Sequence, residues 1–278
     1  MIKNEFRIKM KIKLIETKSI ITKSSLPDAD FVINPYVGCQ HACIYCYADF
    51  MKRFTGHGGE EWGDFIDVKI NSAQTIKKPM FKEKTVLLGS VTDPYQPAES
   101  KYKITQQILQ KLLSFQPNLE ILTKSALVYR DIELLEQFEN LKVGISLNTL
   151  NPEVSKKLEP YASTPKGRIN TLKRLHLNGI KTYLFISPIF PKITDYKKII
   201  SESRDFVDEV LFENLNIRAN NKSKIIGFIE SYNPDLIPFY QNLQNNSNYW
   251  DKLEQEISNY CLKNEIKFKT YFCHGGSK

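Results

Sequence analysis

The chain has 278 residues, of which 41% are hydrophobic and 25% charged, with a formal net charge of +8. This is the composition of a globular protein, and it excludes a disordered or collagen-like chain. No stretch approaches about 18 apolar residues and the first residues lack the apolar core of a secretory signal, so we expect a cytoplasmic protein with no membrane partner.

The N-terminal segment is predicted to contain a basic strand. Residues 8–14, IKMKIKL, alternate strictly between apolar and basic residues. This period of two predicts a half-buried strand with Ile8, Met10, Ile12 and Leu14 on one face. Turn residues follow at 23–30, so residues 1–30 are interpreted as an N-terminal extension.

From residue 31 onward, apolar runs alternate with amphipathic helical patterns. The predicted strands are 31–38, 85–91, 119–125, 141–149, 180–189, 209–216 and 266–272. The predicted helices are 103–115, 130–140, 167–179, 195–207 and 249–264, and a further helix is expected from residue 151. About six βαβ units with right-handed crossovers predict an α/β fold with a parallel sheet that closes or nearly closes into a barrel.

The predicted organisation is a partial (β/α)6 TIM-like barrel with short extensions at both ends. The core barrel is expected at residues 31–216, and a C-terminal extension at 217–278 is expected to pack on it. Within that extension the Asn-rich stretch 220–248 is predicted to be a long surface loop. The glycine-rich segment 55–63 lacks the ending of a phosphate loop and is predicted to be a mobile loop over the barrel mouth, with His57 exposed.

Three of the five cysteines fall within eight positions, as Cys39, Cys43 and Cys46 in the pattern CxxxCxxC. A clustered, odd set does not suit a disulfide framework, and soft thiolates select zinc, copper(I) or iron–sulfur clusters. A closed zinc site or a fully ligated [4Fe–4S] cluster needs a fourth ligand. The candidates for that ligand are His41, Cys261, Cys273 and His274. Without one, an iron would stay open to a substrate or cofactor.

The motif, with aromatic Tyr45 before its third cysteine, resembles the cluster motif of the radical SAM superfamily. The stretches NPYVGCQHACIYCYA, GSVTDPYQPAE, LTKSALVYRDIELL and LEPYASTPKGRINTLKRLHLNGI also resemble its spore photoproduct lyase-related branch, often labelled DNA repair photolyase-like. The resemblance implies one [4Fe–4S] cluster on Cys39, Cys43 and Cys46. Its open iron would bind S-adenosylmethionine, and reductive cleavage would give a 5′-deoxyadenosyl radical that takes hydrogen from a substrate. An electron donor such as flavodoxin or ferredoxin is implied as well.

Polar residues near the predicted strand ends are candidates for cofactor binding, because chemistry in such barrels sits at the carboxyl ends of the strands. Together with Tyr45 and the helix residue Arg168, the set implied by the resemblance is Tyr45, Ser90, Asp93, Lys124, Ser146, Asn148 and Arg168. Ser90 or Asp93 would replace the Gly-Gly-Glu stretch that holds the cofactor's amino group in many relatives. Lys124 and Arg168 would meet its carboxylate, and Ser146 and Asn148 its ribose and carboxylate.

Ordinary structural roles remain open for four of these residues. Asp93 could form a turn, and Asn148 could cap the helix that follows it. Lys124 could be a solvated rim lysine and Arg168 a solvated helix arginine.

The remaining cysteines have simpler interpretations. Cys261 lies on an amphipathic helix and is predicted to be a core residue. Cys273, near the predicted mouth, is either a hydrogen donor to a substrate radical or an ordinary buried residue; no other catalytic residue is predicted. Photoproduct lyase uses a cysteine at the end of its second strand, and the matching residues 89–93 here contain none. We therefore do not expect repair of thymine dimers.

Three functional hypotheses follow, each for a monomer. The first is a radical SAM enzyme, lyase-like or modifying, acting on nucleic acid or a nucleotide; the basic excess and the lysines of residues 8–14 favour it. The second is radical modification of a peptide or small metabolite. The third is a zinc-stabilised, non-catalytic binding protein.

Overall fold

The structure, a computed structural model, describes residues 10–77, 81, 83–243 and 246–272. Its main sheet has eight strands in the order β11-β10-β9-β8-β7-β6-β3-β2. These are β2 (Ile21–Lys23), β3 (Phe31–Ile33), β6 (Thr85–Leu88), β7 (Asn118–Thr123), β8 (Leu141–Ser146), β9 (Lys181–Ile189), β10 (Glu209–Asn214) and β11 (Phe268–Tyr271). Neighbours from β3 to β11 are parallel, and β2 runs antiparallel to β3. The prediction of an α/β fold built on a parallel sheet is confirmed, with β2 and β11 as edges of an open sheet.

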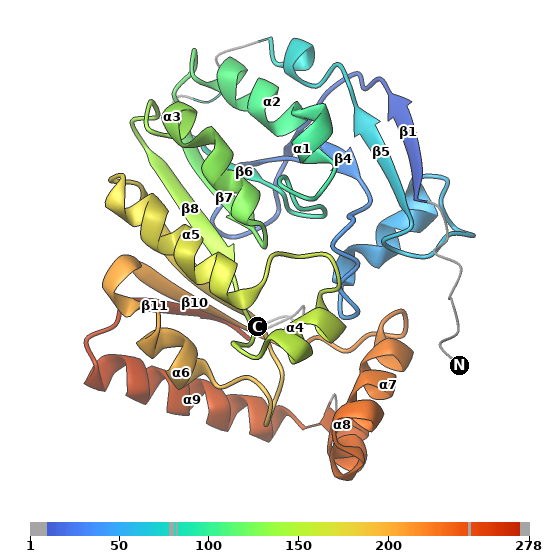
Figure 1. Ribbon diagram of the computed structural model, residues 1–278, viewed down its shortest axis with the longest axis vertical. Helices are drawn as coiled ribbons and strands as arrows, with labels where there is room; N and C mark the ends of the chain where they lie inside the picture. The colour runs from blue at the N-terminus through green and yellow to red at the C-terminus, as the bar shows by residue number, and fades with distance from the viewer. Residues whose placement is uncertain (1–9, 78–80, 82, 244–245, 273–278) are drawn as a thin grey trace.

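Helices follow the strands along the chain. They are α1 (Glu99–Tyr102), α2 (Ile104–Leu112), α3 (Ile132–Leu135), α4 (Pro152–Leu158), α5 (Pro165–Leu177), α6 (Tyr196–Ser201), α7 (Lys222–Tyr232), α8 (Ile237–Asn242) and α9 (Ser247–Lys263). Figure 1 shows α2, α3, α5, α6 and α9 arranged along one side of the curved sheet. The core between these layers contains fully buried residues such as Val143 and Ile145 of β8 and Leu172 and Leu175 of α5.

The register of the parallel strands brings their carboxyl ends to one edge. Ile33 pairs with Leu88, Thr123 with Ile145, and Ser146 with Phe185. The segments after β3, β6, β7 and β8 therefore meet at this edge. Both the cysteine motif and most of the predicted cofactor residues lie on these segments.

A second, three-stranded sheet lies beside the main one, in the order β1-β5-β4 (Figure 1). It consists of β1 (Lys11–Ile15), β4 (Tyr36–Val37) and β5 (Phe65–Lys69). The prediction of a half-buried face on the N-terminal strand is wrong, because Ile12 and Leu14 are 44% and 55% exposed. As an edge strand, β1 pairs with β5, and among the described residues no layer covers Ile12 and Leu14. Met10, just before β1, is partly buried against the main core, and Ile8 lies outside the described residues.

The segment 55–63 is tied to the second sheet. The His57 ring stacks on Phe65 with centroids 3.8 Å apart, and His57 Nε2 lies 3.1 Å from Asp67 Oδ2. His57 Nδ1 also contacts Glu60, whose carboxylate accepts from Lys11 at 2.8 Å. The expectation of an exposed His57 is therefore wrong.

The Asn-rich stretch 220–248 was expected to be a surface loop, and this expectation is also wrong. It contains α7 and α8, because Ile225, Phe228 and Ile229 recur at helical spacing and are buried. Several asparagines lie at helix ends instead of in loops: the Asn233 side chain accepts from the N–H of Asp235. Within the described part of the chain, no helix is long and apolar enough to cross a bilayer.

Candidate cluster and cofactor site

The cysteine motif lies on a tight loop after β4. Gly38 has a φ of +82°, and a Cβ there would lie 2.5 Å from the backbone oxygen of Phe65, so glycine is required. Within the loop the N–H of Ala42 donates to the carbonyl of Cys39 at 3.3 Å, and that of Cys46 to the carbonyl of Cys43 at 3.1 Å. These turns place the three cysteines at the edge where the strands end.

Burial raises the pKa of all three motif thiols to about 12. The thiolate is the metal-binding form, so these sulfurs need a nearby positive centre to ionise at neutral pH. Part of the required stabilisation is built in. Backbone N–H groups of His41 and Asp93 donate to the Cys39 sulfur, and that of Ala48 donates to Cys46.

The donor set suits a cluster better than a single ion. Among the described residues, no three Cys, His, Asp or Glu side chains converge as a single bound ion would require. A multi-iron cluster accepts thiolates on separate irons, which suits three cysteines of one loop. Cys261 is fully buried in the main core, as predicted, and Cys273 and His274 lie outside the described residues.

Asp93 joins the loop after β6 to both its neighbours. Its carboxylate accepts from the Thr123 hydroxyl at 2.6 Å, from the Lys124 N–H at 2.8 Å and from the Tyr95 N–H at 2.8 Å. His41, buried in the cysteine loop, has its Nδ1 3.3 Å from Asp93 Oδ2. Burial alone would raise the pKa of Asp93, but His41 and these hydrogen bonds lower it to about 2. Asp93 therefore remains ionised, and its carboxylate stabilises the turn at residues 93–95 beside the cluster loop.

Ser90 is held by Asn34. The Asn34 side chain accepts from the Ser90 N–H at 3.0 Å and donates to the Ser90 hydroxyl at 3.1 Å. The hydroxyl of Tyr47, directly after the last cysteine of the motif, donates to the Ser90 carbonyl. Ser90 is thus fixed next to Tyr47, whereas Asp93 meets the loop at Cys39, whose sulfur accepts from the Asp93 N–H.

A second polar group converges on Glu159, a buried carboxylate that the sequence reasoning missed. Glu159 follows α4 and accepts from the Tyr45 hydroxyl, from Asn148 Nδ2 at 3.3 Å and from Arg168 Nη2. The Lys124 ammonium lies 5.9 Å from the centre of the Tyr45 ring. Four of the seven predicted cofactor residues therefore gather here. The sequence signal for Glu159 was its place in LEPY, within a stretch that resembles the lyase-related branch. Because LEPY does not end a predicted strand, Glu159 was not chosen as a candidate.

Arg168 is neither solvated nor open to a ligand in this arrangement. Its guanidinium is 0% exposed, and it donates to the carbonyls of Ser146 and Ser163 at 2.9 and 2.8 Å as well as to Glu159. Burial opposes the charge on both partners, but their pairing outweighs it, so the pKa of Glu159 is lowered and that of Arg168 raised. Ser146 itself is buried, and its hydroxyl donates to the carbonyl of Ser187 at 3.2 Å.

One atom of this group is unpaired. Asn148 Oδ1 is buried and has no hydrogen-bond partner within the described residues. Leaving such an oxygen unpaired costs about 1–3 kcal/mol, which a bound ligand with an amine or hydroxyl donor would recover. Asn148 thus fits a role in cofactor binding, and its helix cap role is filled by Asn151.

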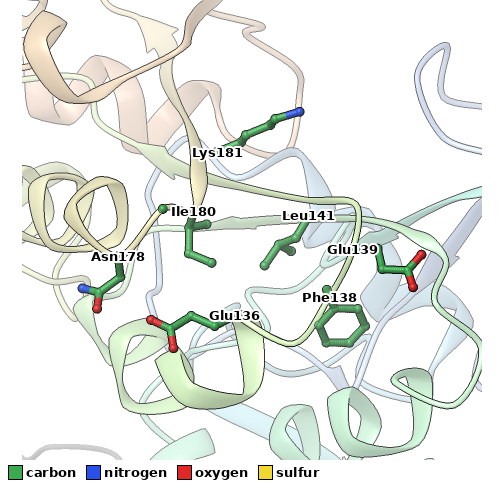
Figure 2. Close-up of a pocket in the computed structure, with 8 residues that line it drawn as sticks. Glu136, Phe138, Glu139, Leu141, Asn178, Ile180 and Lys181 are labelled. Atoms are coloured by element: carbon green, nitrogen blue, oxygen red, sulfur yellow. The ribbon is translucent and has the colours of Figure 1, made fainter.

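The pocket in Figure 2 is unrelated to this site. Its lining includes Leu141 and Lys181, which begin β8 and β9. It therefore lies at the amino ends of the strands, away from the edge that carries the cysteines.

Comparison with known proteins defines the class. The sequence model of the radical SAM superfamily matches residues 33–200, which include the cysteine loop and most of the strand ends described above. The chain belongs to the radical SAM superfamily, and it is a radical SAM enzyme. This family uses a [4Fe–4S] cluster and S-adenosylmethionine.

Similar sequences and a similar solved structure extend this comparison. An uncharacterized protein of Methanocaldococcus jannaschii is 37% identical over 266 residues, covering 96% of this chain and 99% of that protein. A radical SAM Nα-GlyT isomerase of Pseudomonas phage M6 is 30% identical over 203 residues, covering 71% of this chain and 39% of the isomerase. Spore photoproduct lyase, solved with a dinucleoside spore photoproduct, has a similar fold with a TM-score of 0.66 at 15% identity, covering 94% and 82% of the two chains.

Proposed function

We propose that Cys39, Cys43 and Cys46 hold one [4Fe–4S] cluster and that the adjoining strand ends bind S-adenosylmethionine. When bound, these groups supply a one-electron cleavage that yields a 5′-deoxyadenosyl radical able to take hydrogen from a substrate. The observation that carries the proposal is three free thiols on one tight loop, with Cys39 buried and Cys43 and Cys46 half-buried beside the strand ends.

The chain's own residues would position the cofactor. Asn148 offers an unpaired amide oxygen to a donor, and Lys124 offers an ammonium to a carboxylate. Burial would lower the pKa of Lys124, but the negative charges of Cys43, Glu159 and Asp93 outweigh burial and raise that pKa, so Lys124 stays charged. A flavodoxin or ferredoxin is the proposed electron donor.

The proposed substrate is a nucleic acid, and the observation that favours it is an exposed aromatic strip directly after the cluster loop. The strip consists of Tyr47, Phe50 and Phe54, with Phe54 75% exposed. Tyr47 and Phe50 stack at 6.4 Å between centroids, and Phe50 meets Phe54 at 6.2 Å. Exposed Arg53 lies beside Phe54. Aromatic side chains next to a cation are the usual platform on which unpaired bases stack.

Similarity in fold supports the same substrate class. Spore photoproduct lyase was solved with a dinucleoside spore photoproduct. This chain has an exposed aromatic strip and a net charge of +8, which favours a polyanionic substrate. Because residues 89–93 contain no thiol, a reaction other than thymine dimer repair remains our prediction.

The cluster proposal is tested on anaerobically purified protein. It should be brown, contain about four irons per chain, and convert S-adenosylmethionine to 5′-deoxyadenosine when reduced. Colourless protein carrying one zinc per chain would overturn it in favour of the non-catalytic alternative.

The substrate proposal is tested by titrating single-stranded DNA and RNA at several salt concentrations. Phe54→Ala should weaken binding by about 1–3 kcal/mol, the usual worth of one base stack, and affinity should fall with salt. Leu262→Ala on α9, where Leu262 is 70% exposed, is the matched control. Absence of salt-dependent binding would redirect the search to peptides or metabolites.

A further inference from the structure

The segment that follows α4 forms backbone hydrogen bonds with the cluster loop both before and after Glu159 in the sequence. The N–H of Ile44 donates to the carbonyl of Leu158 at 3.0 Å, and the N–H of Tyr161 donates to the carbonyl of His41 at 3.4 Å. Between them, Tyr45 donates its hydroxyl to Glu159. The loop between the first and last cysteines is therefore attached to residues 158–161 at three points.

Glu159 also connects this loop to two other elements. Through Asn148 it reaches the end of β8, and through Arg168 it reaches α5. Arg168 in turn fixes the carbonyl of Ser146, the last residue of β8. One carboxylate thus sets the spacing between the cluster loop and the strand end that presents the unpaired amide oxygen.

The charge of Glu159 matters as much as its hydrogen bonds. Three charged groups gather around Tyr45, which lies between Cys43 and Cys46. Glu159 accepts from the Tyr45 hydroxyl, Arg168 pairs with Glu159, and Lys124 Nζ lies 5.9 Å from the centre of the Tyr45 ring. Removing the carboxylate would leave two buried or half-buried cations next to a cluster ligand. An electron added to the cluster would then be stabilised more strongly.

We propose that Glu159 is a positioning residue: it orients Tyr45 and Asn148 and balances the charge of Arg168 beside the cluster. This inference rests on the proposed function, since it assumes a cluster on the three cysteines. In this role Glu159 influences both the reduction potential of the cluster and the affinity for S-adenosylmethionine.

The test is Glu159→Gln, with Glu153→Gln, an exposed carboxylate of α4, as the matched control. Three quantities are measured: iron content, the potential of the cluster by an EPR-monitored titration, and S-adenosylmethionine affinity by calorimetry. We expect iron to be retained, the potential to move in the positive direction, and affinity to fall about 10-fold, as for partners that orient metal ligands. The control should match the wild type in all three.

Two further variants separate charge from geometry. Tyr45→Phe removes the two hydrogen bonds of the Tyr45 hydroxyl, to Glu159 and from Asn148, and keeps the ion pair. It should therefore weaken S-adenosylmethionine binding and leave the potential unchanged. Glu159→Gln combined with Arg168→Gln restores neutrality, so its potential should return toward the wild-type value. If Glu159→Gln does not fold, Tyr45→Phe decides the question, because it removes the contact with Glu159 without removing the buried carboxylate.

The outcomes distinguish the two proposals. A wild-type protein without a cluster overturns the proposed function. The role of Glu159 alone is overturned if the wild type has a cluster and cleavage activity but the variants behave like it. In that outcome Glu159→Gln has the wild-type potential and affinity, and Tyr45→Phe has the wild-type affinity.

Discussion

The three cysteine side chains have different surroundings. Cys39 is buried in a small apolar cluster with Trp62 and Phe65, close to the ionised Asp93. Cys43 faces the charged group formed by Lys124, Glu159 and Arg168. Charged side chains therefore affect the ionisation of the Cys43 thiol, whereas the thiolate form of Cys39 is stabilised mainly by backbone N–H groups.

Replacing Cys43 with Ala should abolish both the brown colour and cleavage of S-adenosylmethionine, because only two loop thiolates would remain. The measurement is iron content together with 5′-deoxyadenosine formation. Cys261→Ala is the control: that cysteine lies in the core, so iron and cleavage should be retained while the free energy of unfolding falls by about 1 kcal/mol. A coloured, active Cys43→Ala protein would refute the ligand assignment.

Local sequence pattern pointed to some of the residues that gather beside the cysteine loop and not to others. The cysteine spacing is a local signal, and strand ends pointed to Asn148 and Lys124. Glu159 escaped because its contact with Tyr45 spans 114 residues, and nothing in the local pattern records such a pairing. The same fact explains why Arg168 was not predicted to be an internal ion-pair partner: its environment is made by distant segments.

At the scale of elements, β8 and β9 pack so closely that one position excludes a side chain. A Cβ on Gly144 of β8 would lie 2.1 Å from the ring of Tyr183 on β9. Gly144→Ala should therefore lower the free energy of unfolding by about 1–3 kcal/mol, measured by urea denaturation.

A matched substitution is available in α7. Gly227 is exposed, and an added Cβ would meet nothing within 4 Å. Gly227→Ala should leave stability unchanged or raise it by up to about 1 kcal/mol, because alanine favours the helix. Equal effects at the two positions would contradict the packing argument.

The segment 55–63 should make stability depend on pH through His57. Burial opposes its protonation, but Asp67 and Glu60 outweigh this and raise the pKa of His57. A raised folded-state pKa contributes stability that is complete below the unfolded value of about 6.5 and is lost as pH rises through the folded value.

The measurement is the melting temperature of the wild type and of His57→Gln across this pH range. The advantage of the wild type should be largest at pH 6 and should shrink as the pH increases. An advantage that is constant or grows with pH would show that the charge on His57 contributes nothing.

Elements with strong apolar signals were predictable, and elements that depend on context were not. Strands β6 to β10 are rich in buried apolar residues, such as Leu119 and Ile121 of β7, and these strands were found. Helices α7 and α8 were missed because asparagine hid a helical spacing of buried residues. The exposed apolar face of β1 could not be foreseen, since alternation shows two faces but not whether a layer covers one.

For the whole molecule, the main apolar core and the cluster loop are separate. The large core contains Cys261 but none of the three loop cysteines. Removing metal with a chelator should therefore leave the far-UV circular dichroism unchanged. Local loss should be confined to the loop, seen as faster amide hydrogen exchange at residues 39–46. Global unfolding on chelation would show that the cluster supports the entire fold.

The long span between the cluster loop and its anchor has a consequence during protein synthesis. Tyr45 is 114 residues ahead of Glu159, so at about 5–20 residues per second the ribosome completes the thiols roughly 6–23 s before the segment that encloses them. Throughout that interval the nascent chain offers three unshielded sulfurs to oxygen and to stray metal. The contacts that hold the loop in its folded arrangement can form only after residues 158–161 have been synthesised.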